Sequence, residues 1–202
     1  MLRGVYHSGM ITVFNSTGTN PLQLWSTAAP ATDAENSSIC FGKDEAGDNN
    51  DKIHIEGAVL TIKSQNLRDT FISCPRSLDG TLGIKLPFMT IQLKNLGHLF
   101  SFEIETLDDH KLIRRFRASN YQAQAQLDHD IATLPLRLEQ GWNHLTFDLE
   151  DMTKRLYGRK HCETRRITIH ASIGLRLVMF SDRIVAEEQL PGELRLYGIL
   201  DD

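Results

Sequence analysis

The feature of this sequence that most constrains its fold is the alternation of apolar and polar residues in many short segments. In LFSFEIETL (99–107), Phe100, Phe102 and Ile104 share one side of an extended chain, because successive side chains of a strand point to opposite faces. Similar runs occupy 10–16, 21–26, 52–57, 59–64, 70–75, 83–95, 111–120, 131–138, 143–150, 166–172, 175–182 and 194–199. Strands in this number predict an all-β fold, a single antiparallel β-sandwich of jelly-roll type over residues 1–202.

Three segments depart from this alternation. LEDMTKRLYG (149–158) predicts one short helix, with Asp151 or Thr153 near its start and Gly158 at its end. Residues 185–193 are expected to hold one further helical turn. Residues 28–51 contain six acidic residues and one lysine among small polar residues. This composition predicts a polar, mobile insertion loop that is dispensable for folding.

Motifs and composition argue against several functional classes. No GxSxG, HExxH, P-loop or GxGxxG sequence is present, so nothing supports an enzyme. The eight histidines include no HxH repeat, and we expect neither a metal site nor another cofactor. No segment has the roughly 18 consecutive apolar residues of a membrane-spanning helix, and the N-terminus does not read as a signal peptide. Three cysteines without a CxxC pair favour a reduced, cytoplasmic compartment.

Positive charge gathers in the second half of a chain whose net charge is −4. RRFRASNYQ (114–122) places three arginines around Phe116, and residues 154–176 carry seven basic side chains against the single Glu163. If Phe116 is in the core, alternation directs Arg115 and Arg117 outward. Arg114 then lies near the strand end, where its stem can cover apolar surface.

These arginines leave three interpretations open. A solvated strand face is the usual role of such a charge run. Binding of nucleic acid would need aromatic side chains interleaved on the exposed face, and Phe116 alone is a thin platform. The surface of an acidic protein is the other candidate partner, and a fold that brings the second basic segment to the same side would favour it.

Several unusual stretches occur together in this sequence: PLQLW at 21–25, TLGIKLPF at 81–88, RRFRASNYQ at 114–122, GWN at 141–143 and FSDR at 180–183. With them the chain resembles the cilia- and flagella-associated protein 20 family along nearly its whole length. The resemblance implies a non-enzymatic structural protein of the ciliary and flagellar axoneme and the basal body. It further implies a place at the inner junction of doublet microtubules, where the B-tubule closes onto the A-tubule, and a role in doublet stability and motility.

The resemblance also implies partners. These are tubulin of the A- and B-tubule walls, the parkin-co-regulated protein and other microtubule inner proteins, with no membrane and no nucleic acid expected. Because the outer surface of tubulin is acidic, the basic segments are the expected contacts. The candidate partner-binding residues are Arg114, Arg115, Arg117, Asn120, Tyr121, Lys154, Arg155, Arg159, Lys160 and Arg165.

Two other functions share the same expected fold. A glycan-binding module would expose a row of tryptophan or tyrosine side chains on one face, whereas Trp25 and Trp142 lie in apolar contexts typical of a core. A nucleic-acid-binding β-sandwich would share the arginines and would show steep salt dependence.

Overall fold

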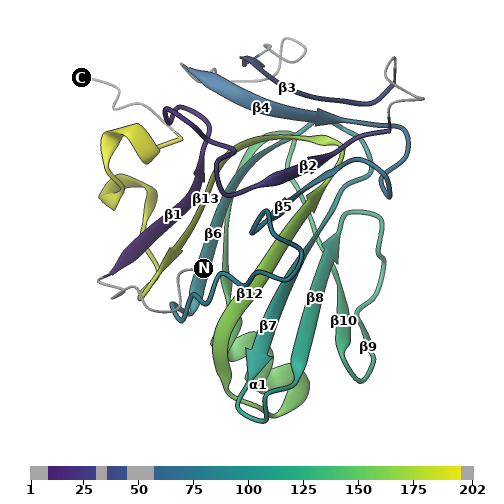
Figure 1. Ribbon diagram of the computed structural model, residues 1–202, viewed down its shortest axis with the longest axis vertical. Coiled ribbons are helices and arrows are strands. Elements are labelled where there is room, and N and C mark those ends of the chain that lie inside the picture. The colour runs from purple at the N-terminus through teal and green to yellow at the C-terminus, as the bar shows by residue number, and fades with distance from the viewer. Residues whose placement is uncertain (1–8, 31–35, 45–56, 197–202) are drawn as a thin grey trace.

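Two facing β-sheets make up most of the chain in the computed structural model, which describes residues 9–30, 36–44 and 57–196 (Figure 1). The first sheet consists of β1 (Met10–Asn15), β3 (Ser38–Lys43), β4 (Ala58–Lys63), β6 (Phe88–Asn95), β11 (Gly141–Asp148) and β13 (Ile173–Ser181). The second consists of β2 (Ser26–Ala28), β5 (Phe71–Cys74), β7 (Ser101–Asp108), β8 (Ile113–Ser119), β9 (Gln126–Leu127), β10 (Ile131–Pro135) and β12 (His161–His170). The predicted all-β sandwich is confirmed.

The order of the strands places distant segments side by side. In the first sheet the order is β11-β6-β13-β4-β3, with β1 paired to β13; in the second it is β2-β5-β12-β7-β8-β10-β9. Neighbouring strands are antiparallel except β10 and β8, which run parallel. The centre of the second sheet therefore carries β12, β7 and β8 next to one another.

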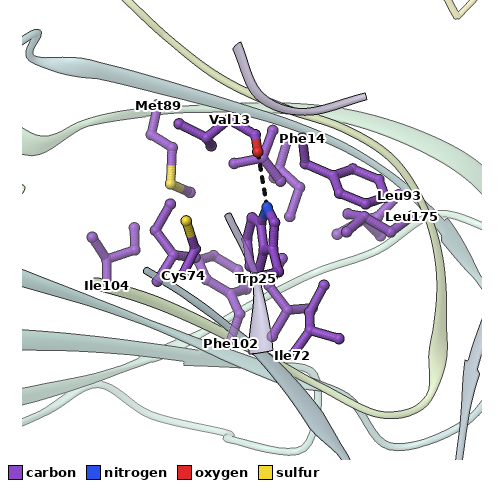
Figure 2. Close-up of a cluster of buried hydrophobic side chains, with 14 of the residues drawn as sticks. Val13, Phe14, Trp25, Ile72, Cys74, Met89, Leu93, Phe102, Ile104 and Leu175 are labelled. Carbon is purple, nitrogen blue, oxygen red and sulfur yellow. Dashed lines mark hydrogen bonds between the residues drawn. The ribbon is translucent and has the colours of Figure 1, made fainter. Parts of the chain in front are cut away.

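The core fills the space between the sheets around Trp25 (Figure 2). The Trp25 side chain is fully buried, its Nε1 donates a hydrogen bond of 2.8 Å to the carbonyl oxygen of Val13, and its ring meets Phe14 edge-on. Phe102 and Ile104 from β7 also point into this core, as their alternation predicts. A buried tryptophan is stable in the core when its indole N–H has a hydrogen-bond acceptor, as it does here.

The helix α1 (Leu149–Tyr157) closes one end of the sandwich, beside the turn that joins β7 and β8 (Figure 1). Its N-cap is Asp148, whose carboxylate accepts a hydrogen bond from the backbone N–H of Asp151, so neither Asp151 nor Thr153 caps it. It ends at Gly158, which has a left-handed φ of 63° and donates to the carbonyl of Lys154. The predicted helix and its glycine stop are confirmed.

Three of the expected strands differ in the structure. Residues 21–24 form turns, and the bonds Gln23 N–H to Asn20 and Trp25 N–H to Leu22 replace a ladder, so β2 begins only at Ser26. The strand expected at 83–95 begins only at Phe88, the first residue of β6. Of residues 83–87, Ile84 alone forms a bridge, to Thr164. Leu194 belongs to a 3-10 turn, and the expected strands at 52–57 and 194–199 otherwise lie almost wholly outside the described residues.

The sequence predicted a loop over the whole of segment 28–51, but part of this segment is a strand. Its residues 38–43 form β3, which pairs along its length with β4. Asp44 is buried, and its carboxylate lies 2.9 Å from Lys94 Nζ and accepts a hydrogen bond of 3.0 Å from the indole of Trp142. This part of the segment is therefore tied to the sandwich. The prediction was wrong because most side chains of this edge strand are exposed, and its pairing with β4 is made by backbone hydrogen bonds that do not depend on composition.

The C-terminal part of the described chain covers the outside of the first sheet. It contains the 3-10 turns η2 (Glu187–Gln189) and η3 (Gly192–Leu194), in agreement with the helical turn expected at 185–193. Leu190 and Leu194 pack on Leu177 and Met179 of β13. The carboxylate of Glu187 lies 2.8 Å from Nδ1 of His144. The outer face of the first sheet is therefore covered at β13, in addition to its inner face, which packs on the core.

Burial of His161 makes stability depend on pH. Desolvation at the start of β12 lowers the pKa of His161 to about 4. In the unfolded chain this pKa is about 6.5, so below that pH the unfolded state binds a proton that the folded state does not. We expect the protein to lose about 2 kcal/mol of unfolding free energy from this group between pH 7 and pH 5. Urea unfolding of wild type and His161→Gln at both pH values measures it; equal losses in the two proteins would contradict the assignment.

Candidate docking surface

The open outer face of the second sheet carries a compact set of charged side chains. Glu103 and Glu105 on β7 lie directly opposite Arg117 and Arg115 on β8. Asp130 precedes β10, and Arg165 comes from β12. The charged face, as used below, comprises Glu103, Glu105, Arg115, Arg117, Asp130 and Arg165. Phe116 is buried beneath it, so the predicted outward direction of Arg115 and Arg117 is confirmed.

Each arginine of the charged face already has a carboxylate partner within the chain. Arg115 Nη2 lies 2.8 Å from Asp130 Oδ2, and both side chains are nearly half exposed. Their hydrogen bond lowers the pKa of Asp130 and raises the pKa of Arg115. The charged face is therefore a pattern of alternating signs, and the two arginines are not the free cations that the sequence alone suggested.

The other two arginines of this face are paired in the same way. Arg117 Nε donates to Glu103 Oε1 at 2.8 Å, and Arg165 Nε donates to Glu105 Oε1 at 3.2 Å. The three carboxylates were missed from the sequence. The alternation of glutamate with apolar residues in FEIE, placed opposite RRFR, is the signal that would have indicated Glu103 and Glu105.

Arg114 lies inside the molecule and not on the charged face. Its Nε is 2.9 Å from Asp108 Oδ2, and both side chains are almost fully buried. Its guanidinium lies 4.5 Å from the ring centre of Tyr157 on α1 and donates to the carbonyl oxygen of His129. The structure thus makes Arg114 an internal link between β8, α1 and the segment before β10, because its strand position points it inward with Phe116.

Asn120 and Tyr121 lie at the opposite end of β8 from α1. Asn120 Oδ1 accepts from the backbone N–H of Phe100, and its Nδ2 donates to the carbonyl of His98, each at 2.8 Å. Asn120 is therefore engaged in holding the turn before β7. Tyr121 is about half exposed.

The second basic segment divides between two places. Lys154 and Arg155 are exposed on α1, where Arg155 pairs with Asp151. Arg159 donates from Nη1 to Nε2 of His110, and the backbone of Lys160 bonds to that of Asp109, which places both at the β7–β8 turn.

Only Arg165 of the predicted residues in this segment joins the charged face. The neighbouring Arg166 instead donates to the carbonyl oxygens of Pro75, Ser77, Leu78 and Gly80 and so holds that loop. The two sequence-distant basic segments thus reach the same face of the second sheet, on β8 and β12 with β7 between them, but through fewer residues than predicted.

Other kinds of site find little support in the part of the chain that the structure describes. No three His, Cys, Asp or Glu side chains there are grouped closely enough to hold a metal ion. Among those same residues no helix has the length and apolar character needed to cross a membrane. Cys74 is buried, which raises the pKa of its thiol to about 12 and leaves it protonated and poorly nucleophilic.

The aromatic side chains also bear on function. Trp25 and Trp142 are both buried, as predicted, and among the described residues the large exposed aromatic side chains are Phe41 and Tyr121. Phe41 lies on β3 of the first sheet and Tyr121 follows β8 of the second sheet, so the two form no row. A platform of stacked aromatic rings for sugars is therefore not present among these residues.

Comparison with known proteins agrees with the resemblance seen in the sequence. The chain is 42% identical over 197 residues to cilia- and flagella-associated protein 20 of Caenorhabditis elegans, covering 98% of this chain and 91% of the relative. It is 41% identical to the protein of the same name from Chlamydomonas reinhardtii, covering 98% and 97%.

Among solved structures, a family 11 carbohydrate-binding module of a Clostridium thermocellum cellulosomal cellulase matches with a TM-score of 0.42 and 8% identity, covering 90% of this chain and 99% of that one. No functional argument follows from so distant a likeness. Residues 1–198 match the CFA20 domain, and with relatives of this identity along almost the whole chain, the protein belongs to the CFA20 domain family.

Proposed function

We propose that this protein is a non-enzymatic structural component of cilia and flagella. The observation that carries the proposal is the match, over almost the entire chain, to relatives named for cilia and flagella. In the finer form of the proposal it lies in the axoneme and basal body and bridges the A- and B-tubules at the inner junction of doublet microtubules. There it stabilises the doublet and supports motility.

The partners proposed for this position are tubulin of both tubule walls, the parkin-co-regulated protein and other microtubule inner proteins. The charged face supports such a role because it lies on a rigid sheet, so its geometry is fixed before a partner arrives. It is also the open face of the sandwich, since the first sheet is covered by η2 and η3. An acidic partner is proposed to contact Arg115, Arg117 and Arg165 on this face.

The existing ion pairs do not prevent these contacts. Arg115 uses only Nη2 and Arg117 uses Nε and Nη2 for their partners, so each guanidinium keeps at least one N–H group for another carboxylate. Lys154 and Lys160, whose side chains form no ion pair with the described residues, add uncompensated positive charge at the α1 end. Each exposed pair contributes about 0.2–1 kcal/mol, so the proposed binding relies on repetition along the filament.

Exchange of Arg115 and Arg117 together for serine tests this docking role. We expect microtubule co-sedimentation in the presence of the parkin-co-regulated protein to weaken between about twofold and thirtyfold. Wild-type binding should fade with added salt, because exposed charges are screened. Stability should change by about 0.5 kcal/mol or less per site, as for other surface changes.

The matched control is Arg183→Ser with Lys43→Ser, which removes the same charge from exposed positions outside the charged face. This double variant is expected to bind like wild type. The docking role is wrong if the Arg115 and Arg117 variant binds as well as wild type at low salt. It is also wrong if that variant unfolds, because the two arginines would then be structural.

A further inference from the structure

An elongated groove crosses the end of the sandwich that lies opposite α1. One part, of about 490 Å³, is lined by residues between β4 and β5 and by side chains from the near ends of β7, β8 and β12. A second part of about 490 Å³ continues toward the end of β4. The two parts share Gln65, Leu67 and Leu99, so they form one continuous depression.

Side-chain hydrogen bonds fix the walls of this groove. Ser172 Oγ accepts from the backbone N–H of Ser64 at 3.1 Å and donates to its carbonyl at 2.9 Å. His170 Nδ1 donates to the carbonyl of Leu67 at 2.9 Å. On the other side, Asn120 holds the turn that carries Leu99, through the two bonds described above. The groove is therefore preformed, and a ligand would not need to order its walls.

The lining combines an apolar strip with excess positive charge. Leu67, Leu99 and Tyr121 supply the strip, and Leu99 and Tyr121 are about half exposed. Covering such side chains with an apolar group of a partner is favourable. Beside them lies the exposed Arg68, whose guanidinium has no ion pair among the described residues. The one acid of this part, Glu103, already accepts two hydrogen bonds from Arg117.

His170 adds a directional polar group to the lining. Since a carbonyl oxygen can only accept, the bond to Leu67 requires that Nδ1 carry the proton. Burial lowers the pKa of His170, so the ring is neutral near pH 7 and its Nε2 is an acceptor. An acceptor at this position suits a backbone N–H of an extended ligand.

We propose that this groove binds an extended acidic peptide segment of a partner protein, with an apolar side chain seated on Leu67, Leu99 and Tyr121. Carboxylates of the peptide pair with Arg68 and with the remaining N–H of Arg117, while its backbone passes His170. The length of the groove favours an extended chain over a compact small molecule. The site goes beyond the ciliary role proposed above and does not rest on it.

The proposal also assigns a role to Asn120 and Tyr121, at the end of RRFRASNYQ, which are not part of the charged face. Arg117 and Tyr121 line the groove, and Asn120 positions the opposite wall. A sugar would need more aromatic surface than Tyr121 offers, and a nucleic acid would need several exposed aromatic rings on which its bases could stack. An acidic peptide fits the lining better than either.

Fluorescence anisotropy with a labelled octapeptide, Glu-Glu-Leu-Glu-Glu-Phe-Glu-Glu, tests the site. We expect saturable binding to wild type, and none for the same peptide with lysine in place of glutamate. Arg68→Glu should weaken binding at least about tenfold, because it exchanges a charge-assisted bond for repulsion. Tyr121→Ala should weaken it by a similar factor with little change in the salt dependence. Both positions are exposed, so melting temperatures should match wild type.

Arg183→Glu is the matched control, since it makes the same charge change at an exposed position beyond the far end of β13. It should bind like wild type. In an NMR titration of the wild-type protein with the peptide, the backbone amide signals that change should be those of residues 64–69, 98–101 and 170–172. Absence of saturable binding, or binding that Arg68→Glu and Tyr121→Ala leave unchanged, would overturn the proposal. Shifts at the same residues with the neutral sugar cellohexaose, and none with the peptide, would assign the groove to glycans instead.

Discussion

Replacing Asp108 by alanine is expected to lower the free energy of unfolding by about 3–5 kcal/mol. The Asp108 carboxylate is fully buried; Oδ2 accepts from Arg114 Nε at 2.9 Å, and Oδ1 accepts from the backbone N–H groups of His110 and Leu112. Its removal leaves the buried Arg114 guanidinium without a counter-ion and two backbone donors without an acceptor. A charge stranded in the interior costs far more than an exposed pair gains.

The effect of Asp108 also has a definite pH range. Burial opposes its ionisation, but the hydrogen bonds from Leu112, Arg114 and His110 outweigh burial and lower the pKa of the carboxyl group. The stabilisation is therefore present at neutral pH and is lost as the pH falls below the ordinary aspartate value of about 3.9. Urea unfolding at pH 7 measures the loss.

The neighbouring Asp109 gives a matched control. It is exposed and accepts only a weak bond of 3.3 Å from the backbone of Lys160, so Asp109→Ala should cost no more than about 1 kcal/mol. If Asp108→Ala were as mild as Asp109→Ala, the buried pair would not be the link between β7 and β8 that its geometry indicates.

Asp44→Ala is expected to destabilise the protein by a similar amount, about 3–5 kcal/mol, with a melting temperature lower by roughly 6–20 °C. The side chains of Asp44 and Lys94 are both more than nine-tenths buried, and the carboxylate also accepts from Trp142 Nε1. Truncation removes two hydrogen bonds in a buried setting, one from the Lys94 ammonium group and one from the indole N–H of Trp142. Thermal unfolding followed by circular dichroism gives the measurement.

This result would measure how strongly Asp44 ties the acidic segment 28–51 to the sandwich. Asp79→Ala, which changes the same residue type at an exposed turn, should leave the melting temperature nearly unchanged. Equal melting temperatures for Asp44→Ala, Asp79→Ala and wild type would show that the contacts of Asp44 contribute little, and would be consistent with a dispensable segment.

Most of the sandwich was predictable from sequence, because half-buried strands must alternate. β7, β8 and β11 show that pattern and lie where it predicts. The same pattern misled at 21–24, where turn bonds between residues three apart take the place of a ladder. It gave no warning of β3, whose residues are mostly exposed and are held by backbone pairing to β4.

For the candidate site, the sequence predicted which side chains point outward, but not which residues they pair with. Alternation sufficed to direct Arg115 and Arg117 outward and Phe116 inward. The identity of their neighbours depends on strand register, which sets Glu103 opposite Arg117, and on the parallel β10, which brings Asp130 to Arg115. Asp44 and Trp142, 98 residues apart in sequence, are related only by the fold.

The alternating signs of the charged face have a kinetic consequence. Opposite charges a few ångströms apart cancel one another's field over a distance comparable to the Debye length, about 8 Å at physiological ionic strength. Such a face exerts little long-range pull on a partner, so it does not accelerate diffusional encounter as a uniformly basic patch would. At contact the same charges are specific, because each must meet its opposite. Such a surface distinguishes partners by their dissociation rates more than by their association rates. This property suits a protein that is held in a lattice by its neighbours more than one that must be captured from dilute solution.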